Sequence, residues 1–197
     1  AKNLQYQPIR VTATSYDAKV DTSYTIKELT SVRAGVYKVP GFDYSKAHSL
    51  GLTVSESMFD IQYGVSKYSE GRKECFRPKF EIYLKLKPQT MFIAAELKNN
   101  SCLFKETYEH EYKHSQFNQK ALETLKEELT PWITQYVPDK IYYQSSSLWI
   151  SNVRADISSK ILPYIKSRYE EIANNLNYSL DTAAEYARLS TVCANRN

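Results

Sequence analysis

The sequence predicts an α+β domain in which strands come first and helices follow. Three features of the 197 residues support this fold class: period-two alternation of apolar residues in 59–65 and 80–86, a stretch without Gly or Pro in 101–130, and apolar residues three or four apart in 146–175. We expect a single domain over residues 1–197, with strands mainly in 1–98 and helices mainly in 101–197. The strand part should form a mostly antiparallel sheet.

The strands are expected in short segments bounded by polar turns. Segments 7–14 and 23–26 are rich in residues that favour strands. In 59–65 and 80–86 every second residue is apolar, the pattern of a half-buried strand. Pro88 then begins a turn into an apolar segment, 91–96, so we expect a hairpin there.

A long helix is expected over 101–130. It is rich in Glu, Lys, Leu, Gln and Ala, Ser101 offers a cap for its first turn, and Pro131 marks its end. An apolar stripe follows helical spacing through Ala121, Leu122, Leu125 and Leu129. This helix should therefore pack one face against the rest of the domain.

Two further helical regions are expected toward the C-terminus. Region 146–175 carries an apolar stripe, and Pro163 should kink or split it. The segment 182–189 reads as a short terminal helix in which Thr182 and Glu185 form a reciprocal capping box.

Composition excludes several classes of protein. No apolar run reaches the length needed to span a membrane, and Gly and Pro are too few for a disordered or collagenous chain. The net charge is +4, from 26 Lys and Arg against 22 Asp and Glu, but the basic residues are scattered along the chain. We therefore expect neither a membrane span nor a nucleic-acid partner.

The three cysteines, Cys75, Cys102 and Cys193, predict a disulfide rather than a thiolate zinc site, because no CxxC occurs. Cys75 and Cys102 flank a segment whose closure would stabilise the fold by about 3 to 4 kcal/mol. The pairing among the three stays open. A disulfide, and a chain that begins at Ala1 without Met, favour a secreted or periplasmic protein, of bacterial type.

The pentapeptide His110-Glu111-Tyr112-Lys113-His114 is the motif that carries chemistry. Inside a helix, residues four apart lie on one face about 5 to 6 Å apart, so His110 and His114 can bind one zinc ion. Zinc activates a water molecule, and Glu111 can take its proton as general base. The alternative is a solvated, charged helix face that binds nothing.

A catalytic zinc needs a third protein ligand. Glu128 lies 14 residues beyond His114 on the same helix, about 21 Å away, and is excluded. We choose Glu185 as the third ligand, with His48 and Asp181 as alternatives. The alternative role of Glu185 is the capping box, which needs no metal.

The HExxH helix, preceded by 91–96 as a candidate edge strand, resembles the zincin metallopeptidases, whose edge strand pairs with extended substrate. The wider layout of Cys75, two strands, Cys102, the HExxH helix and Asp181 resembles predicted secreted bacterial zinc-dependent proteases of unknown function. This resemblance implies His110 and His114 as zinc ligands and Glu111 as general base. No Gly-x-x-His follows the motif as it does in metzincins, and no Asp stands four residues after Glu185 as in many thermolysin-like enzymes.

The expected function is that of a zinc metallopeptidase, which hydrolyses peptide bonds of a peptide or protein substrate with a metal-activated water. The alternative is a non-catalytic exported binding or structural protein on a zincin-like scaffold, with its 17 Tyr supplying a binding surface. Zinc content and a requirement for Glu111 separate the two. We expect Asn118 to be a surface residue, with orientation of an imidazole as the alternative.

Overall fold

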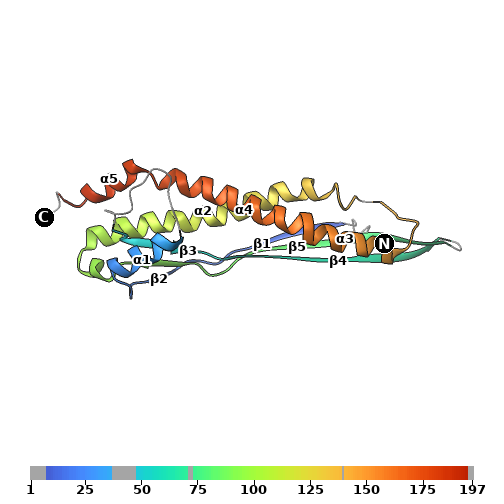
Figure 1. The fold of residues 1–197 in the computed structure, drawn as a ribbon, viewed down its shortest axis with the longest axis horizontal. Helices are drawn as coiled ribbons and strands as arrows, with labels where there is room; N and C mark the ends of the chain where they lie inside the picture. Colours follow the sequence, from blue (N-terminus) through green and yellow to red (C-terminus); the bar gives the residue numbers. More distant parts are fainter. Residues whose placement is uncertain (1–7, 37–47, 71–72, 139, 195–197) are drawn as a thin grey trace, which may run out of the picture. The chain divides into compact units, whose positions relative to one another are not determined.

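The computed structural model describes residues 8–36, 48–70, 73–138 and 140–194, and it contains both helices and strands (Figure 1). The predicted α+β class is confirmed. The chain divides into two compact units, each built from three segments. The first unit comprises Ala1–Thr14, Ser57–Lys85 and Leu122–Ile172, and the second comprises Ser15–Glu56, Leu86–Ala121 and Ala173–Asn197. That the chain forms one domain stays a prediction.

The sheet of the first unit has the strand order β1-β5-β4, from β1 (Ile9–Thr14), β4 (Ser57–Glu70) and β5 (Lys73–Leu86). On β5, Phe80, Ile82 and Leu84 are buried and alternate with less buried residues, as the period-two pattern predicts. Strand β1 runs parallel to β5, with Ile9 opposite Phe80. The mostly antiparallel sheet expected from the sequence is thus a mixed one, because local alternation does not indicate that a distant strand, β1, lies parallel to β5.

The sheet of the second unit has the order β2-β6-β3, from β2 (Lys19–Asp21), β3 (Gly51–Val54) and β6 (Thr90–Ile93). Strand β6 pairs in parallel with β2 and antiparallel with β3. The expectation that 91–96 forms an edge strand is wrong, since β6 is central and β3 lies at the edge. After Ile93 the chain turns into a 3₁₀ helix, η2 (Ala95–Asn99).

No strand forms at 23–26, where one was expected; residues 23–25 are irregular and helix α1 (Ile26–Val36) begins at Ile26. Its start is a capping box: the Thr25 hydroxyl accepts from the Glu28 N–H, and the Glu28 carboxylate accepts from the Thr25 N–H. The Glu96 carboxylate also accepts from the Ile26 N–H. Leu29 packs against a buried cluster that includes Ile93, which fixes α1 to the sheet of the second unit.

Helix α2 (Ser101–Ile133) carries the HExxH motif and runs three residues beyond its expected end at Thr130. Pro131 lacks an N–H, so it costs one helical hydrogen bond near the end, and the fully buried Ile133 anchors the last turn. The first-turn cap is Asn100, whose side chain accepts from the Leu103 N–H, instead of Ser101. The stripe at Ala121, Leu122, Leu125 and Leu129 is buried, as predicted.

The C-terminal helices are α3 (Ser146–Asp156), α4 (Leu162–Leu180) and α5 (Ala183–Thr191). A π-helical turn, η3 (Ile157–Ile161), joins α3 to α4 two residues before Pro163, so the α-helical hydrogen-bond pattern is interrupted there while the backbone stays helical. Thr182 caps α5 by accepting from the Glu185 N–H, which is one half of the predicted capping box. The other half is replaced, because the Thr182 N–H donates to the Leu180 carbonyl and the Glu185 carboxylate accepts from Arg188.

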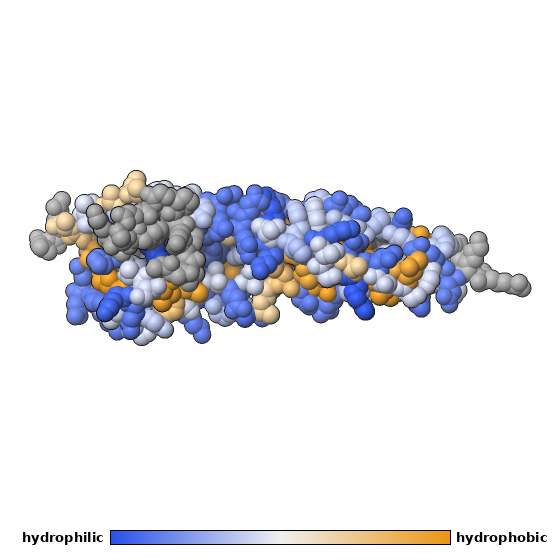
Figure 2. Space-filling model, viewed as in Figure 1, coloured by the Kyte–Doolittle hydropathy of each residue, from blue (hydrophilic) through white to orange (hydrophobic). Residues whose placement is uncertain are grey.

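The disulfide joins Cys102 to Cys193, across a sequence separation of 91. Cys75 is buried and free, so the loop closure between Cys75 and Cys102 considered from sequence does not occur. The bond ties the first turn of α2 to the segment that follows α5 within the second unit. None of the described helices is both long and apolar enough to cross a membrane. On the face shown in Figure 2, hydrophilic residues predominate and hydrophobic residues form small separate groups.

Candidate metal centre

The two histidines of the motif lie one turn apart on α2 and turn the same ring nitrogen toward each other. Their Nε2 atoms are 3.1 Å apart, and the rings stand edge to face with centroids 4.8 Å apart. Both are largely buried, with exposed fractions of 5% for the His110 side chain and 12% for that of His114. The spacing of four therefore produces the shared face that the sequence predicts.

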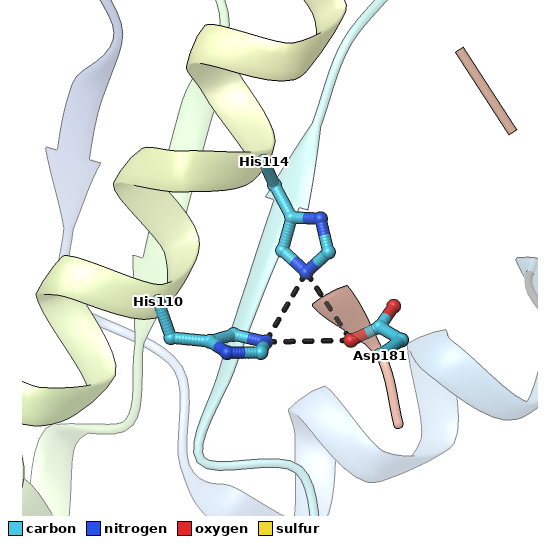
Figure 3. Close-up of side chains that lie close together, drawn as sticks. All are labelled: His110, His114 and Asp181. Carbon is cyan, nitrogen blue, oxygen red and sulfur yellow. Dashed lines mark hydrogen bonds and ion pairs between the residues drawn. The ribbon is translucent and has the colours of Figure 1, made fainter. Parts of the chain in front are cut away.

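Asp181 completes this group. It stands between the last residue of α4, Leu180, and the cap of α5, Thr182, and its side chain is 5% exposed. Its Oδ1 lies 3.3 Å from Nε2 of His110 and 3.2 Å from Nε2 of His114 (Figure 3). Zinc ligands about 2.0 to 2.1 Å from a tetrahedral ion are roughly 3.3 Å from one another. The three atoms are therefore spaced as ligands of one such ion.

The other ring nitrogen of each histidine has a different partner. Glu185 Oε1 lies 3.4 Å from Nδ1 of His110, and Asn177 Oδ1 lies 2.6 Å from Nδ1 of His114. Glu185 is thus on the opposite edge of the His110 ring from Asp181, and Arg188 donates two hydrogen bonds to its carboxylate. The geometry favours Asp181 over Glu185 as third ligand. His48 is exposed and lies outside the group.

Glu111 packs between α2 and the edge strand β3. Its side chain is buried, and the Thr53 hydroxyl on β3 lies 2.7 Å from its Oε2. A Cβ added at Gly51 would stand 2.7 Å from both Cγ and Oε1 of Glu111, so the strand backbone passes directly over this side chain. The alternative of a solvated helix face is wrong for His110 and Glu111, which are both 5% exposed.

The charged groups of the site stabilise one another's ionised forms. Burial raises the pKa of the Asp181 carboxyl, but hydrogen bonds from His110, His114 and Tyr186 outweigh it and hold that pKa well below its usual range. Burial lowers the pKa of His114, yet Asp181 and the charge of Glu111 leave it raised overall. Hydrogen bonds from Arg188 bring the pKa of Glu185 to about 2, so both carboxylates are ionised.

Sequence reasoning left several residues of the site unassigned. Tyr186 donates a 2.6 Å hydrogen bond to Asp181 Oδ1, and the Arg33 guanidinium on α1 contacts the same phenol oxygen. Asn177 and Thr53 were not considered. The amide of Asn177 stands four residues before Asp181, but nothing in the sequence indicates which Asn reaches a histidine.

Comparison of the chain with protein-family models, with curated proteins and with solved structures found no match. The case for a site therefore rests on the residues themselves. In the described part of the chain, His110, His114 and Asp181 form a group that could hold a metal ion. Two imidazole nitrogens and one carboxylate oxygen are a common ligand set for a catalytic zinc, which keeps a further position open.

Proposed function

We propose that this protein is a zinc-dependent metallopeptidase that hydrolyses peptide bonds. The convergence of Nε2 of His110, Nε2 of His114 and Oδ1 of Asp181, at mutual distances of 3.1 to 3.3 Å, is the observation that carries the proposal. This donor set suits zinc, whereas magnesium and calcium prefer oxygen ligands alone.

Glu111 is the residue proposed to move protons. A bound zinc would act as a Lewis acid that activates water and polarises the scissile carbonyl. Glu111 would accept the proton from that water and pass it to the leaving amine, so that water adds across the peptide bond. Its proximity to the site supports this role, since its charge raises the pKa of His114. The contact with Thr53 would orient its carboxylate.

Strand β3 is the proposed place for an extended substrate. Among the described strands it is at the edge of its sheet, antiparallel to β6, and it packs on Glu111 through Gly51. A peptide in extended conformation can add to such an edge through main-chain hydrogen bonds. The scissile bond would then lie beside the carboxylate proposed as general base.

Export from the cell is proposed on the disulfide Cys102–Cys193, because such bonds persist in oxidising compartments. The periplasm and the extracellular space both meet this condition. The competing function, a non-catalytic exported binding protein, would keep this disulfide but require neither zinc nor Glu111.

The first experiment measures zinc per chain by elemental analysis of protein purified without added metal or chelator. We expect about one zinc in the wild type and almost none in His110→Ala or Asp181→Asn. His48→Ala and Glu185→Gln serve as matched controls that keep zinc. Zinc lost in Glu185→Gln but kept in Asp181→Asn would reverse the choice of third ligand, and a wild type that takes up no zinc would refute the proposed function.

The second experiment tests catalysis with the zinc-loaded protein on a library of quenched fluorescent peptides. Glu111→Gln should retain zinc and lose activity by about 10² to 10⁴-fold, as expected for removal of a general base. Glu109→Gln, which changes an exposed carboxylate on the same helix, is the matched control and should keep activity. Equal activity in both variants would exclude Glu111 as general base.

A further inference from the structure

Three side-chain amides form a hydrogen-bonded chain that ends at Nδ1 of His114. They belong to Asn177 on α4, Asn118 on α2 and Gln89, the residue before β6. The Asn177 Nδ2 donates to Asn118 Oδ1 at 3.0 Å, and the Asn118 Nδ2 donates to Gln89 Oε1 at 2.9 Å. Gln89 is fully buried and Asn118 is 6% exposed. Asn118 is therefore an interior residue of the second unit, not the surface residue considered from sequence.

The direction of this amide chain is fixed at both ends by backbone carbonyls, which can only accept hydrogen bonds. At one end, the Gln89 Nε2 donates to the Ser115 carbonyl at 3.0 Å. At the other, the Asn177 Nδ2 donates to the Ala173 carbonyl at 2.8 Å. Turning over either amide would bring two oxygens together at a buried contact. The oxygen of Asn177 must therefore face His114.

The orientation of the Asn177 amide determines which nitrogen of the His114 ring carries the hydrogen. Asn177 Oδ1 lies 2.6 Å from Nδ1, and an amide oxygen needs a donor, so Nδ1 must carry the hydrogen. In the neutral ring, Nε2 is then left with its lone pair. In the protonated ring, the Nε2–H group donates to Oδ1 of Asp181; when that proton leaves, the lone pair of Nε2 faces Nε2 of His110 and Oδ1 of Asp181 (Figure 3).

We infer that Asn177, Asn118 and Gln89 are positioning residues that hold His114 as the Nδ1–H tautomer before any metal is bound. The inference rests on the proposed function, because the lone pair on Nε2 has a role only if a metal ion binds there. Partners of this kind on a ligating histidine typically change metal affinity by 10 to 100-fold. His110 differs, because its Nδ1 faces a carboxylate that is shared with Arg188.

The test reads the tautomer directly, from ¹⁵N chemical shifts of the His114 ring in metal-free protein, at a pH where the ring is neutral. We expect Nδ1–H in the wild type. Asn177→Leu should lose this preference, whereas Asn177→Asp, which keeps an acceptor at Nδ1, should restore it. Asn174→Leu changes an exposed residue on the same helix and is the matched control. Circular dichroism establishes that each variant is folded.

Zinc affinity, measured by competition with a chromogenic chelator, provides a second readout. It should fall by about 10 to 100-fold in Asn177→Leu, fall less in Asn118→Leu, and stay unchanged in Asn174→Leu. An Nε2–H tautomer in the wild type, or the same tautomer in wild type and Asn177→Leu, would overturn the inference. Equal loss in Asn177→Leu and Asn177→Asp would also overturn it, because the amide would then only fill space. If the wild type binds no zinc, the proposed function fails while the tautomer result stands alone.

Discussion

Replacing Gly51 with alanine tests whether β3 closes directly over Glu111. The added methyl carbon would stand 2.7 Å from Cγ and Oε1 of Glu111 and 2.8 Å from Cγ2 of Thr107. Favourable contacts between carbon atoms lie at about 3.5 to 4.0 Å, so strand and helix must separate by close to 1 Å. Overpacking of this kind costs about 1 to 3 kcal/mol, which for a chain of this length lowers Tm by about 2 to 12 °C.

The assay is thermal unfolding followed by circular dichroism, with Gly64→Ala on β4 as the matched control. A Cβ at Gly64 would meet nothing within 4 Å, so this variant should be neutral or more stable by up to about 1 kcal/mol. Adding Glu111→Ala to Gly51→Ala removes two of the three close contacts and should recover about 0.5 to 3 kcal/mol relative to additivity. Equal Tm values for Gly51→Ala and Gly64→Ala would refute the packing of β3 on Glu111.

Three other changes test stability elsewhere. The Tyr169 hydroxyl is buried and, within the described residues, has no hydrogen-bond partner; Tyr169→Phe should therefore raise stability by about 1 to 3 kcal/mol. Burial raises the pKa of Tyr169 to about 12, so wild-type stability should fall as pH rises from 10 toward 12, and urea titrations should show a smaller fall in the variant. Replacing Cys102 and Cys193 together by Ser should cost up to about 5 kcal/mol in the same assay, and unchanged stability would contradict the pairing. Hydrogen bonds from Arg168 lower the pKa of Glu128, so their contribution is present above pH 4.5 and lost on acidification; Arg168→Leu should flatten the acid limb of the stability curve by at most about 1 kcal/mol.

The elements that local sequence determines were the ones that sequence predicted. Period-two alternation located β5, and helical spacing with few breakers located α2 and α4, because each pattern reports which face of one segment is buried. Helix α1 was missed although Thr25 and Glu28 form the same type of capping box that was recognised at Thr182. The sequence interpretation gave more weight to the strand-favouring residues of 23–26 than to this capping box.

Local sequence patterns do not indicate which distant segments of the chain pair with each other. The parallel pairing of β1 with β5 and the bond between Cys102 and Cys193 depend on how the chain returns on itself. With three cysteines, spacing alone favoured the nearer partner, Cys75, since shorter loops close at lower entropic cost. Cys75 is instead part of the buried core of the first unit.

The contrast between Asp181 and Glu185 shows why the acidic residue that joins His110 and His114 could be limited to a few candidates but not chosen from sequence. Both are acidic, both lie near the start of α5, and only their order around the cap Thr182 distinguishes them. Asp181 precedes the cap, where the chain has left α4 and its side chain can reach the Nε2 atoms. Glu185 lies in the first turn of α5, where Arg188 holds its carboxylate on the Nδ1 edge of His110. Asp181, in the turn between α4 and α5, can thus approach α2 from a direction that Glu185, in the first turn of α5, cannot. This difference depends on how the helices are oriented relative to one another, which local sequence patterns do not indicate.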